Sequence, residues 1–290
     1  MNFDVVVNNL TLKYQDFEAL ANLSFTIETG KIYGLIGRNG AGKTSLLSLL
    51  ASFREPSSGT IKIAGESPFE NPDIMQNVAF IFEKDYKEET EKVKGMLELV
   101  ERYRPNYDPE YAMHLIKRFK LPLDKQVKQL SKGMQSAMNV TMGLASRTPI
   151  TIFDEAYLGM DAPTREIFYQ ELLEDQSNHP RTFILSTHLV SEMEYLFEEV
   201  IIIDKGKLVA QEDYETLVSR GASITGAAEA VDALVKGMEI LSEQQLGNTK
   251  SVMIYGNMSD SKRTEAHNSG LEVGATTLQD LFIHLTKEDN

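Results

Sequence analysis

The residues best suited to chemistry form a short glycine-rich segment, GRNGAGKT at 37–44. An apolar run, 31–37, precedes it, and leucines at helical spacing follow it from 44 to 53. Glycines let successive backbone N–H groups face one point, and the start of a helix adds the positive end of its dipole there. A lysine and a hydroxyl complete the pattern G-x-x-x-x-G-K-[ST], which predicts a phosphate-binding loop in preference to a glycine turn without a ligand.

The side chains of this loop have separate expected roles. Lys43 supplies a mobile cation for the β and γ phosphates of a nucleotide, and Thr44 offers its hydroxyl to Mg²⁺. We expect the nucleotide-binding residues of the loop to be Gly37, Arg38, Asn39, Gly40, Ala41, Gly42, Lys43, Thr44 and Ser45.

A second chemically capable pair, Asp154 and Glu155, comes directly after an almost wholly apolar run, 149–153. Carboxylates at the C-terminal end of a buried strand lie where ligands bind in open α/β sheets. Asp154 can hold Mg²⁺ through water, and Glu155 can polarise the water that attacks a γ phosphate. Such a pair by itself is commonly an exposed turn or a helix cap, but a phosphate loop in the same chain favours the catalytic interpretation.

The composition indicates what kind of protein holds these residues. The chain has 290 residues, 42% apolar and 25% charged, which allows one α/β domain of roughly 220 residues and a smaller second one. It contains no cysteine, so we expect neither disulfides nor thiol chemistry, in agreement with a reducing cytosol. A net charge of −14 disfavours sequence-independent binding to DNA or RNA. It does not exclude a nucleotide site, because such a site depends on local backbone dipoles, a lysine and magnesium.

Strands and helices alternate along the first three-quarters of the chain. Period-two patterns at 2–14 and 22–29 predict half-buried antiparallel strands, and short apolar runs separated by helices predict a parallel core. A charged segment, 83–102, opens a region predicted to be helical up to about 147 and divided by prolines. We therefore expect an α/β fold with a parallel, doubly wound core and an added antiparallel layer.

The pattern restarts near 219–222, which predicts two domains, 1–218 and 219–290, with a helical subdomain at about 84–147 in the first. The second domain is predicted to be a small α/β unit with strands near 223–226, 238–242, 251–256 and 271–275 and helices near 227–236, 259–268 and 277–286. No stretch approaches eighteen uninterrupted apolar residues, and the N-terminus lacks the basic-then-apolar order of a signal peptide. We therefore expect any role at a membrane to depend on a partner.

The segment LSKGM at 130–134 narrows the class, because it resembles the LSGGQ signature of the ABC ATPase family. The phosphate loop, this segment, Asp154-Glu155 and His188 occur in the order and at the spacing of that family, and the resemblance covers about residues 3–215. It implies an ABC cassette of the P-loop NTPase class, with a RecA-like parallel core, an antiparallel β layer and a helical subdomain.

The resemblance also implies roles for single residues. Ser131 and Gly133 correspond to the signature residues that bind the γ phosphate of an ATP held by another subunit, and a serine at a helix start beside a glycine exposes N–H donors to an anion. An ordinary N-cap that serves only its own helix is the alternative. Tyr14 corresponds to the aromatic residue that stacks on adenine, although a tyrosine in an early strand commonly serves packing.

Two further segments resemble parts of the family's nucleotide site. Residues 158–161 resemble the D-loop, which joins two subunits, so Asp161 is expected at the nucleotide. His188 resembles the switch histidine that contacts the γ phosphate, which makes it a second expected catalytic residue beside Glu155. A lone histidine after a strand is otherwise commonly structural.

The chain departs from the family pattern at a few positions. Glu83 stands where the family has a glutamine that contacts magnesium and water, and a glutamate can still ligate Mg²⁺ as a hard oxygen donor. We therefore expect Thr44, Asp154 and Glu83 as the metal-binding residues. Lys132 and Met134 replace the second glycine and the glutamine of the signature, whereas Ser131 and Gly133 are retained.

The resemblance implies a hydrolytic cycle with ATP and Mg²⁺ in which two cassettes clamp the nucleotide between them. The expected partners are a second ABC cassette, either an identical copy or a close paralogue, and a polytopic membrane permease subunit, with no nucleic acid. In the family the helical region, here 84–129, carries the groove for the permease. The protein is then expected at the cytoplasmic face of the cell membrane, held there through the permease.

Other functions of an ABC ATPase stay open at this point. A soluble ABC ATPase acting on nucleic acid or ribosomes is disfavoured by the acidic charge and the single set of motifs. A non-hydrolysing nucleotide sensor is disfavoured by the presence of Glu155 and His188. Among transporters the sequence is similar to bacterial exporter ATPases of Gram-positive type, which move antimicrobial peptides, drugs or phenol-soluble modulins. The transported substrate is not written in this chain, because the membrane subunit selects it.

Overall fold

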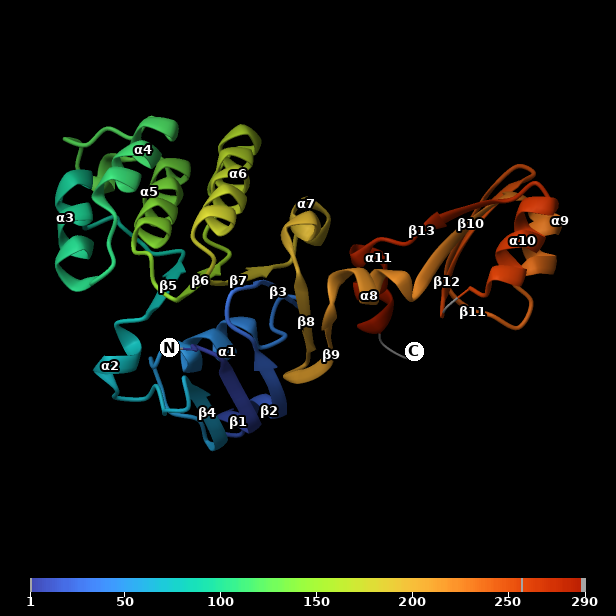
Figure 1. The fold of residues 1–290 in the computed structure, drawn as a ribbon, viewed down its shortest axis with the longest axis horizontal. Coiled ribbons are helices and arrows are strands. Elements are labelled where there is room, and N and C mark those ends of the chain that lie inside the picture. Colours follow the sequence, from blue (N-terminus) through green and yellow to red (C-terminus); the bar gives the residue numbers. More distant parts are fainter. Residues whose placement is uncertain (1, 257, 288–290) are drawn as a thin grey trace. The chain divides into compact units, whose positions relative to one another are not determined.

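The computed structural model describes residues 2–256 and 258–287, and its contacts divide the chain into two units (Figure 1). The first unit runs to His188 and includes Ile203–Leu208, and the second comprises Leu189–Ile202 and the chain from Val209 onward. The predicted accessory domain, 219–290, falls within the second unit, which begins earlier in the sequence than residue 219.

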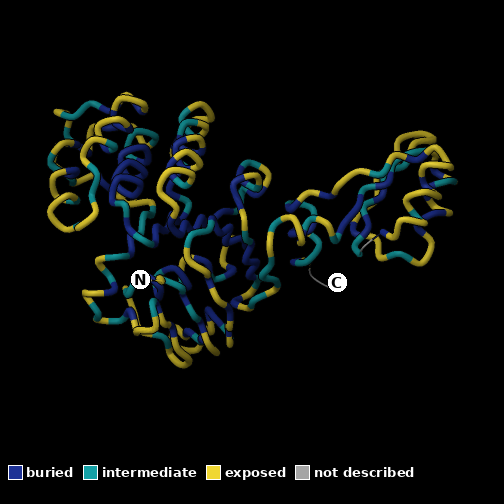
Figure 2. Tube along the Cα trace, viewed as in Figure 1, coloured by how far each residue is buried: buried dark blue, intermediate teal, exposed yellow. Residues whose placement is uncertain are grey.

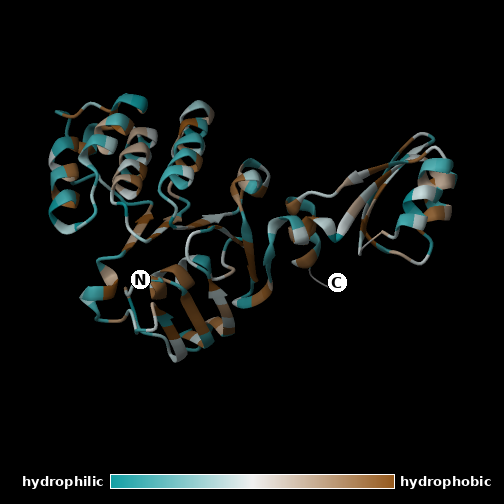
Figure 3. Ribbon diagram, in the orientation of Figure 1, coloured by the Kyte–Doolittle hydropathy of each residue, from teal (hydrophilic) through white to brown (hydrophobic). Residues whose placement is uncertain are grey.

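A three-stranded antiparallel sheet forms one layer of the first unit, with β1 (Val5–Tyr14) between β2 (Phe17–Ile27) and β4 (Ser58–Ile63). The register places apolar residues of β1 opposite apolar residues of both neighbours, as where Val5 lies between Ile27 and Ile63. Figure 3 shows the apolar residues gathered along these strands. The early period-two pattern thus produces a sheet with one buried face.

The core of the first unit is a parallel sheet in the order β5 (Val78–Phe82), β6 (Ile150–Asp154), β7 (Thr182–Thr187) and β3 (Ile32–Ile36). Every residue of β3, β6 and β7 is buried (Figure 2), as in parallel sheets that are covered on both faces. Helix α1 (Lys43–Leu50) follows β3, and α6 (Ala162–Asn178) connects β6 to β7. The predicted α/β fold with a parallel core and an antiparallel layer is confirmed.

The helical subdomain consists of α3 (Val93–Tyr103), α4 (Pro109–Arg118) and α5 (Lys132–Ala145), with a short 3-10 helix η1 at Val127–Gln129. Helices α4 and α6 both pack against α5. The segment after β5 was expected to open the helical region at 83, but the first long helix begins only at Val93. A short helix, α2 (Pro72–Met75), precedes β5 and was not predicted.

The second unit contains α7 (Val190–Met193), the 3-10 helix η2 (Glu194–Leu196) and α8 (Tyr214–Ser219), followed by an antiparallel sheet and three helices. Strands β8 (Glu199–Asp204) and β9 (Lys207–Asp213) form the hairpin predicted at 199–211, and its turn, within Ile203–Leu208, belongs to the first unit. No helix of the described residues combines the length and the apolar composition that crossing a bilayer requires.

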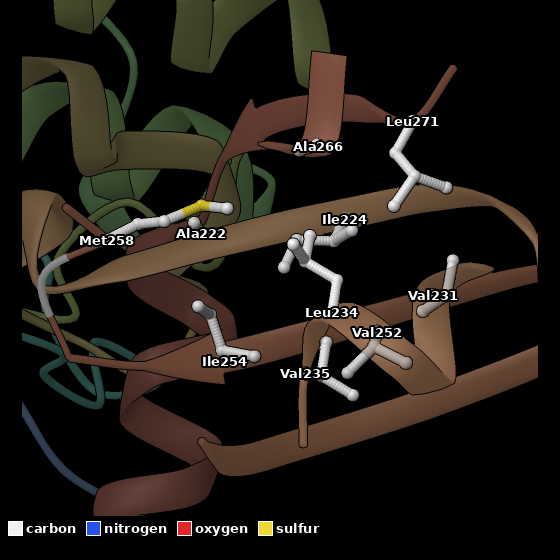
Figure 4. Close-up of a cluster of buried hydrophobic side chains, with 10 residues drawn as sticks. All are labelled: Ala222, Ile224, Val231, Leu234, Val235, Val252, Ile254, Met258, Ala266 and Leu271. Atoms are coloured by element: carbon white, nitrogen blue, oxygen red, sulfur yellow. The ribbon is translucent and has the colours of Figure 1, made fainter. Parts of the chain in front are cut away.

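The C-terminal part of the second unit has the element order β-α-β-β-α-β and the strand order β11-β12-β10-β13, which is the ferredoxin-like arrangement. Its core joins Ile224 and Val252 of the strands to Val231 and Leu234 of a helix (Figure 4). The elements are β10 (Gly221–Ala227), α9 (Ala228–Leu234), β11 (Glu239–Leu246), β12 (Thr249–Tyr255), α10 (Asp260–Asn268), β13 (Glu272–Ala275) and α11 (Leu278–Leu285). They match the strands and helices predicted from the sequence.

A buried charge cluster stabilises the first unit at the ends of its core elements. Asp175, near the end of α6, is 3% exposed and forms ion pairs with Arg147 and Arg181. Arg147 precedes β6, Arg181 directly precedes β7, and Arg181 also donates to the carbonyl of Leu144. One carboxylate thus ties the end of α6 to the chain entering two core strands.

Replacing Asp175 by alanine is expected to lower the free energy of unfolding of the first unit by about 3–5 kcal/mol, because the buried Arg181 guanidinium loses its carboxylate partner and the partly buried Arg147 keeps only the carboxylate of Asp108. Urea denaturation followed by far-ultraviolet circular dichroism checks this, since the chain contains no tryptophan. Asp124→Ala is the matched control, because its side chain is 92% exposed, and it should leave the unfolding midpoint almost unchanged. Equal midpoints for the two variants would contradict the stabilising role of the cluster.

Candidate functional site

The loop between β3 and α1 requires glycine at two positions where neighbouring backbone approaches closely. A Cβ atom at Gly37 would lie 2.6 Å from the carbonyl oxygen of Ile203. Gly42 has φ +106°, and a Cβ there would lie 2.8 Å from the carbonyl oxygen of Ala19. The glycines predicted from the motif therefore have a steric reason, because no other residue fits without moving the backbone.

Lys43 is 6% exposed, so its ammonium group is held within this loop and not in solvent. Its Nζ atom donates to the carbonyl oxygen of Gly37 at 2.7 Å and to that of Arg38 at 3.3 Å. Burial lowers the pKa of Lys43, while the carboxylates of Glu155 and Asp154 act in the opposite direction. A cation with little water around it interacts strongly with an anion that reaches the loop.

Thr44 and Asp154 meet across the sheet edge, although they are far apart in the sequence. The hydroxyl of Thr44 donates to Oδ2 of Asp154 at 2.8 Å. Both are hard oxygen donors, and Mg²⁺ in phosphate sites is held by one or two protein oxygens together with phosphate and water. No group of three or more His, Cys, Asp or Glu side chains suited to a metal occurs among residues 2–256 and 258–287. The donor set fits Mg²⁺ bound together with a phosphate ligand.

Glu155 and His188 form a second contact at the same edge. Nδ1 of His188 lies 2.8 Å from Oε1 of Glu155, and Oε1 lies 3.8 Å from Nζ of Lys43. The backbone of Glu155 has φ +50°, a left-handed conformation that costs a non-glycine residue about 1–3 kcal/mol. Such strain persists where the surroundings fix a side chain in a required direction, and here it directs the carboxylate toward the lysine and the histidine.

A cavity of about 310 Å³ opens beside these groups, and Lys43, Thr44 and Glu155 line it. Tyr14 and Phe17 line its other side, because the tight turn between β1 and β2 pairs the two residues. Phe17 is 65% exposed and was missed in the sequence analysis. The signal that could have identified it is its place just across a short turn from Tyr14.

The signature residues lie at a different cavity, of about 540 Å³, at the starts of α5 and α6. Ser131 caps α5 and accepts a hydrogen bond from the backbone N–H of Met134 at 3.2 Å. Asp161 caps α6 in the same way and accepts from the N–H of Thr164 at 3.0 Å, and this hydrogen bonding lowers the pKa of Asp161. The lining of the first cavity includes neither residue, so within one chain the predicted site residues form two separate groups.

Two glycines allow the start of α5 to contact the loop after β6. A Cβ at Gly133 would lie 2.9 Å from the carbonyl oxygen of Gly159, and a Cβ at Gly159 would lie 2.6 Å from Oγ of Ser136. The two motifs therefore pack closely against each other, and a side chain added at either glycine would clash.

Glu83 does not join the oxygen donors at the sheet edge. Its carboxylate lies 2.5 Å from Nζ of Lys132 at the start of α5. The predicted role of Glu83 as a metal ligand is not visible in its contacts and stays a prediction. Two of the departures from the family motifs, Glu83 and Lys132, therefore contact each other.

Comparison with known proteins agrees with this geometry. Residues 20–158 match the family model described as ABC transporter. The ABC transporter ATP-binding protein YtrB of Bacillus subtilis is 26% identical over 238 residues, covering 82% of each chain. The Nod factor export ATP-binding protein I of Cupriavidus metallidurans is 29% identical over 211 residues, 71% of this chain and 69% of that one. A solved structure of the ATP-binding subunit of an ABC transporter superposes with a TM-score of 0.66 at 24% identity, over 73% of this chain and 91% of that one.

Replacing Gly159 by alanine is expected to lower the free energy of unfolding by about 1–3 kcal/mol, because the new methyl group overlaps Oγ of Ser136. Combining it with Ser136→Ala removes that oxygen and should recover part of the loss. Thermal or urea denaturation of the two single variants and the double variant checks the prediction. If the loss of free energy of unfolding in the double variant equalled or exceeded the sum of the two single losses, the contact with Ser136 would not be the cause.

Proposed function

Because this chain belongs to the family of ABC transporter ATP-binding proteins, we propose that it hydrolyses ATP at the cavity beside Lys43 and thereby drives a transporter. The observation that carries this proposal is the meeting of a buried cation, a hydroxyl–carboxylate pair and a carboxylate–histidine pair at one sheet edge. These groups come from three motifs, namely the phosphate loop, the Asp154-Glu155 pair and the segment of His188, and together they can bind a triphosphate and activate a water molecule.

The nucleotide is held by its two ends. The rings of Tyr14 and Phe17 offer flat apolar surface to the adenine, and the loop 37–44 offers backbone N–H groups and the Lys43 ammonium to the phosphates. Thr44 and Asp154 would hold Mg²⁺, which neutralises phosphate charge when it is bound. Lys43 lies at the base of the loop, where it neutralises charge on the β and γ phosphates.

Hydrolysis requires a water molecule held in line with the γ phosphate. The carboxylate of Glu155 can accept a hydrogen bond from that water and draw its proton as the new P–O bond forms. The contact with His188 orients this carboxylate. In our proposal the imidazole of His188 leaves the carboxylate and contacts the γ phosphate when ATP is bound. Lys43 and the loop N–H groups stabilise the charge that develops on the phosphate oxygens.

Two cassettes are needed to complete the site, because the residues of the signature and the D-loop line a different cavity from the phosphate loop. In our proposal Ser131, Gly133 and Asp161 of one cassette contact the ATP that is held by Lys43 of the other. A two-fold arrangement fulfils this condition twice, with an identical copy or a close paralogue as the second cassette. ATP favours the closed pair because its γ phosphate contacts both cassettes, whereas ADP lacks that group.

A membrane permease subunit is the second partner in this proposal, and the protein then works at the cytoplasmic face of the membrane. ABC ATP-binding subunits act together with permeases, and none of the described helices can cross a bilayer. The helical subdomain, α3 to α5, is the surface we assign to the permease. The identity of the permease decides which substrate the transporter carries.

We further propose that the transporter exports its substrate. The export name of one relative supports this direction, as does the resemblance of the sequence itself to exporter ATPases of Gram-positive type. Peptides and drugs are the substrate classes that this similarity indicates.

Replacing Glu155 by glutamine is expected to lower the ATP turnover number about 100-fold or more, because the group that accepts the proton is lost. Nucleotide binding should persist, so Glu155→Gln should form a dimer with Mg·ATP but not with Mg·ADP. Lys43→Ala should weaken nucleotide binding about tenfold or more, since a charge-assisted contact is removed. Phosphate release measures turnover, size-exclusion chromatography with light scattering measures dimer formation, and equilibrium dialysis with the nucleotide measures binding.

Lys62→Ala is the matched control for the lysine variant, because Lys62 is exposed on β4 and lies outside the cavity. It should hydrolyse ATP at the parent rate. Unchanged turnover in Glu155→Gln, or unchanged nucleotide binding in Lys43→Ala, would refute the proposed site.

The direction of transport is tested with the membrane protein that co-purifies with this chain. Inside-out vesicles containing that protein should take up substrate when ATP is added outside, and vesicles carrying Glu155→Gln should not. Uptake that occurs instead in right-side-out vesicles loaded with ATP would identify an importer.

A further inference from the structure

The contact between Glu83 and Lys132 joins two loops that both belong to the proposed site. Oε1 of Glu83 accepts a hydrogen bond from Nζ of Lys132 at 2.5 Å, and this bonding raises the pKa of Lys132. Glu83 directly follows β5, and Lys132 is the first residue of α5. The pair therefore connects the end of an outer strand of the parallel core to the start of the signature helix.

The sheet register brings Glu83 close to the proposed metal position. Phe82 of β5 lies opposite Asp154 of β6, so the backbone of Glu83 begins one residue past the neighbour of Asp154. From there a glutamate side chain can turn toward Thr44 and Asp154 or toward α5. In this structure it turns toward α5 and Lys132.

A second contact fixes the same loop to the same helix. The hydroxyl of Tyr86 donates to Oδ1 of Asn139 on α5 at 2.6 Å, and Tyr86 is only 5% exposed. Burial raises the pKa of Tyr86 to about 12, so this contact keeps its proton at neutral pH. Asn139 lies two turns after Lys132 on α5, so loop and helix remain joined even when the ion pair opens.

The ion pair is more exposed than this anchor. The side chains of Lys132 and Glu83 are 78% and 62% exposed, and ion pairs in such surroundings are weak and screened by salt. An anion that approaches the start of α5 would compete with Glu83 for the ammonium group. Lys132 also lines the cavity at the starts of α5 and α6. In the proposed function this cavity receives the γ phosphate of the ATP that the second cassette holds.

We propose that Lys132 is a positioning residue that withholds the Glu83 carboxylate from the metal position until phosphate reaches the start of α5. The proposal rests on the proposed function, because it assumes a nucleotide at the Lys43 cavity and a second cassette at α5. When the ammonium of Lys132 turns to the phosphate, Glu83 is released toward Thr44 and Asp154. Closure of the two cassettes is thereby linked to completion of the metal site.

The test uses the full-length protein in the Glu155→Gln background, so that nucleotide is not consumed. Binding of Mn²⁺, a paramagnetic substitute for Mg²⁺, is measured by electron paramagnetic resonance in the presence of ADP or ATP. Four proteins are compared: the parent, Lys132→Gln, Glu83→Gln and the double variant. Lys128→Gln is the control, because Lys128 is exposed in the preceding turn, η1.

With ADP, Lys132→Gln should bind Mn²⁺ about two- to fivefold more tightly than the parent, the range expected when one exposed ion pair is lost. In the Glu83→Gln background the same substitution should have no effect, because Lys132 acts only through Glu83. With ATP the difference between parent and Lys132→Gln should disappear, since phosphate already occupies the lysine. Lys128→Gln should match the parent in both nucleotides.

Three results would overturn the inference: equal Mn²⁺ affinity of the parent and Lys132→Gln with ADP, the same effect of Lys132→Gln with and without Glu83, or an ADP difference that persists with ATP. Each of these leaves ATP binding and hydrolysis by the chain intact. If the parent bound neither nucleotide nor metal, the proposed function itself would fail, so the two failures are distinguishable.

Discussion

The parallel register of four strands places the residues that follow these strands at one end of the sheet, beside the site. Phe82, Asp154 and Ser186 are neighbours across β5, β6 and β7, and Ile36 of β3 lies opposite Thr187. The next residue after each strand is therefore Glu83, Glu155, His188 or Gly37, and all four start at one sheet edge. Slipping one strand by a single residue would move its group away from the others and turn its side chains to the opposite face of the sheet. The apolar strand sequences thus fix the chemistry by fixing the register.

Local and global electrostatics have opposite signs in this protein. The chain carries a net charge of −14, yet the site centres on a buried lysine within reach of Glu155. Backbone N–H groups and one helix start supply positive potential without adding a charged residue. Burial makes these short-range terms stronger than the repulsion of distant surface carboxylates, which water and salt screen. An acidic protein can therefore bind a triphosphate at one site and still repel polyanions elsewhere.

The sequence predicts the strands and the motif loops well because both depend on local patterns. The strands that end at Ile36, Asp154 and Thr187 are mainly apolar. Glycines are sterically required in the loop 37–44, so they appear in its sequence motif. The pairing of Glu83 with Lys132 spans 49 residues and follows no local pattern, so only the packing of α5 against β5 reveals it. Phe17 was not predicted to line the cavity because its position depends on the turn that pairs it with Tyr14.

A molecule that responds to its ligand needs contacts of two strengths. The buried Tyr86–Asn139 hydrogen bond and the Asp175 cluster are costly to open, so they hold their elements together firmly. The exposed Glu83–Lys132 pair costs little to open, so an arriving phosphate can replace it. A ligand shifts a conformational equilibrium only by its difference in affinity for the two states. In our proposal the exposed charges at the start of α5 give the γ phosphate that difference, because it gains Lys132 as a partner only when the pair has opened.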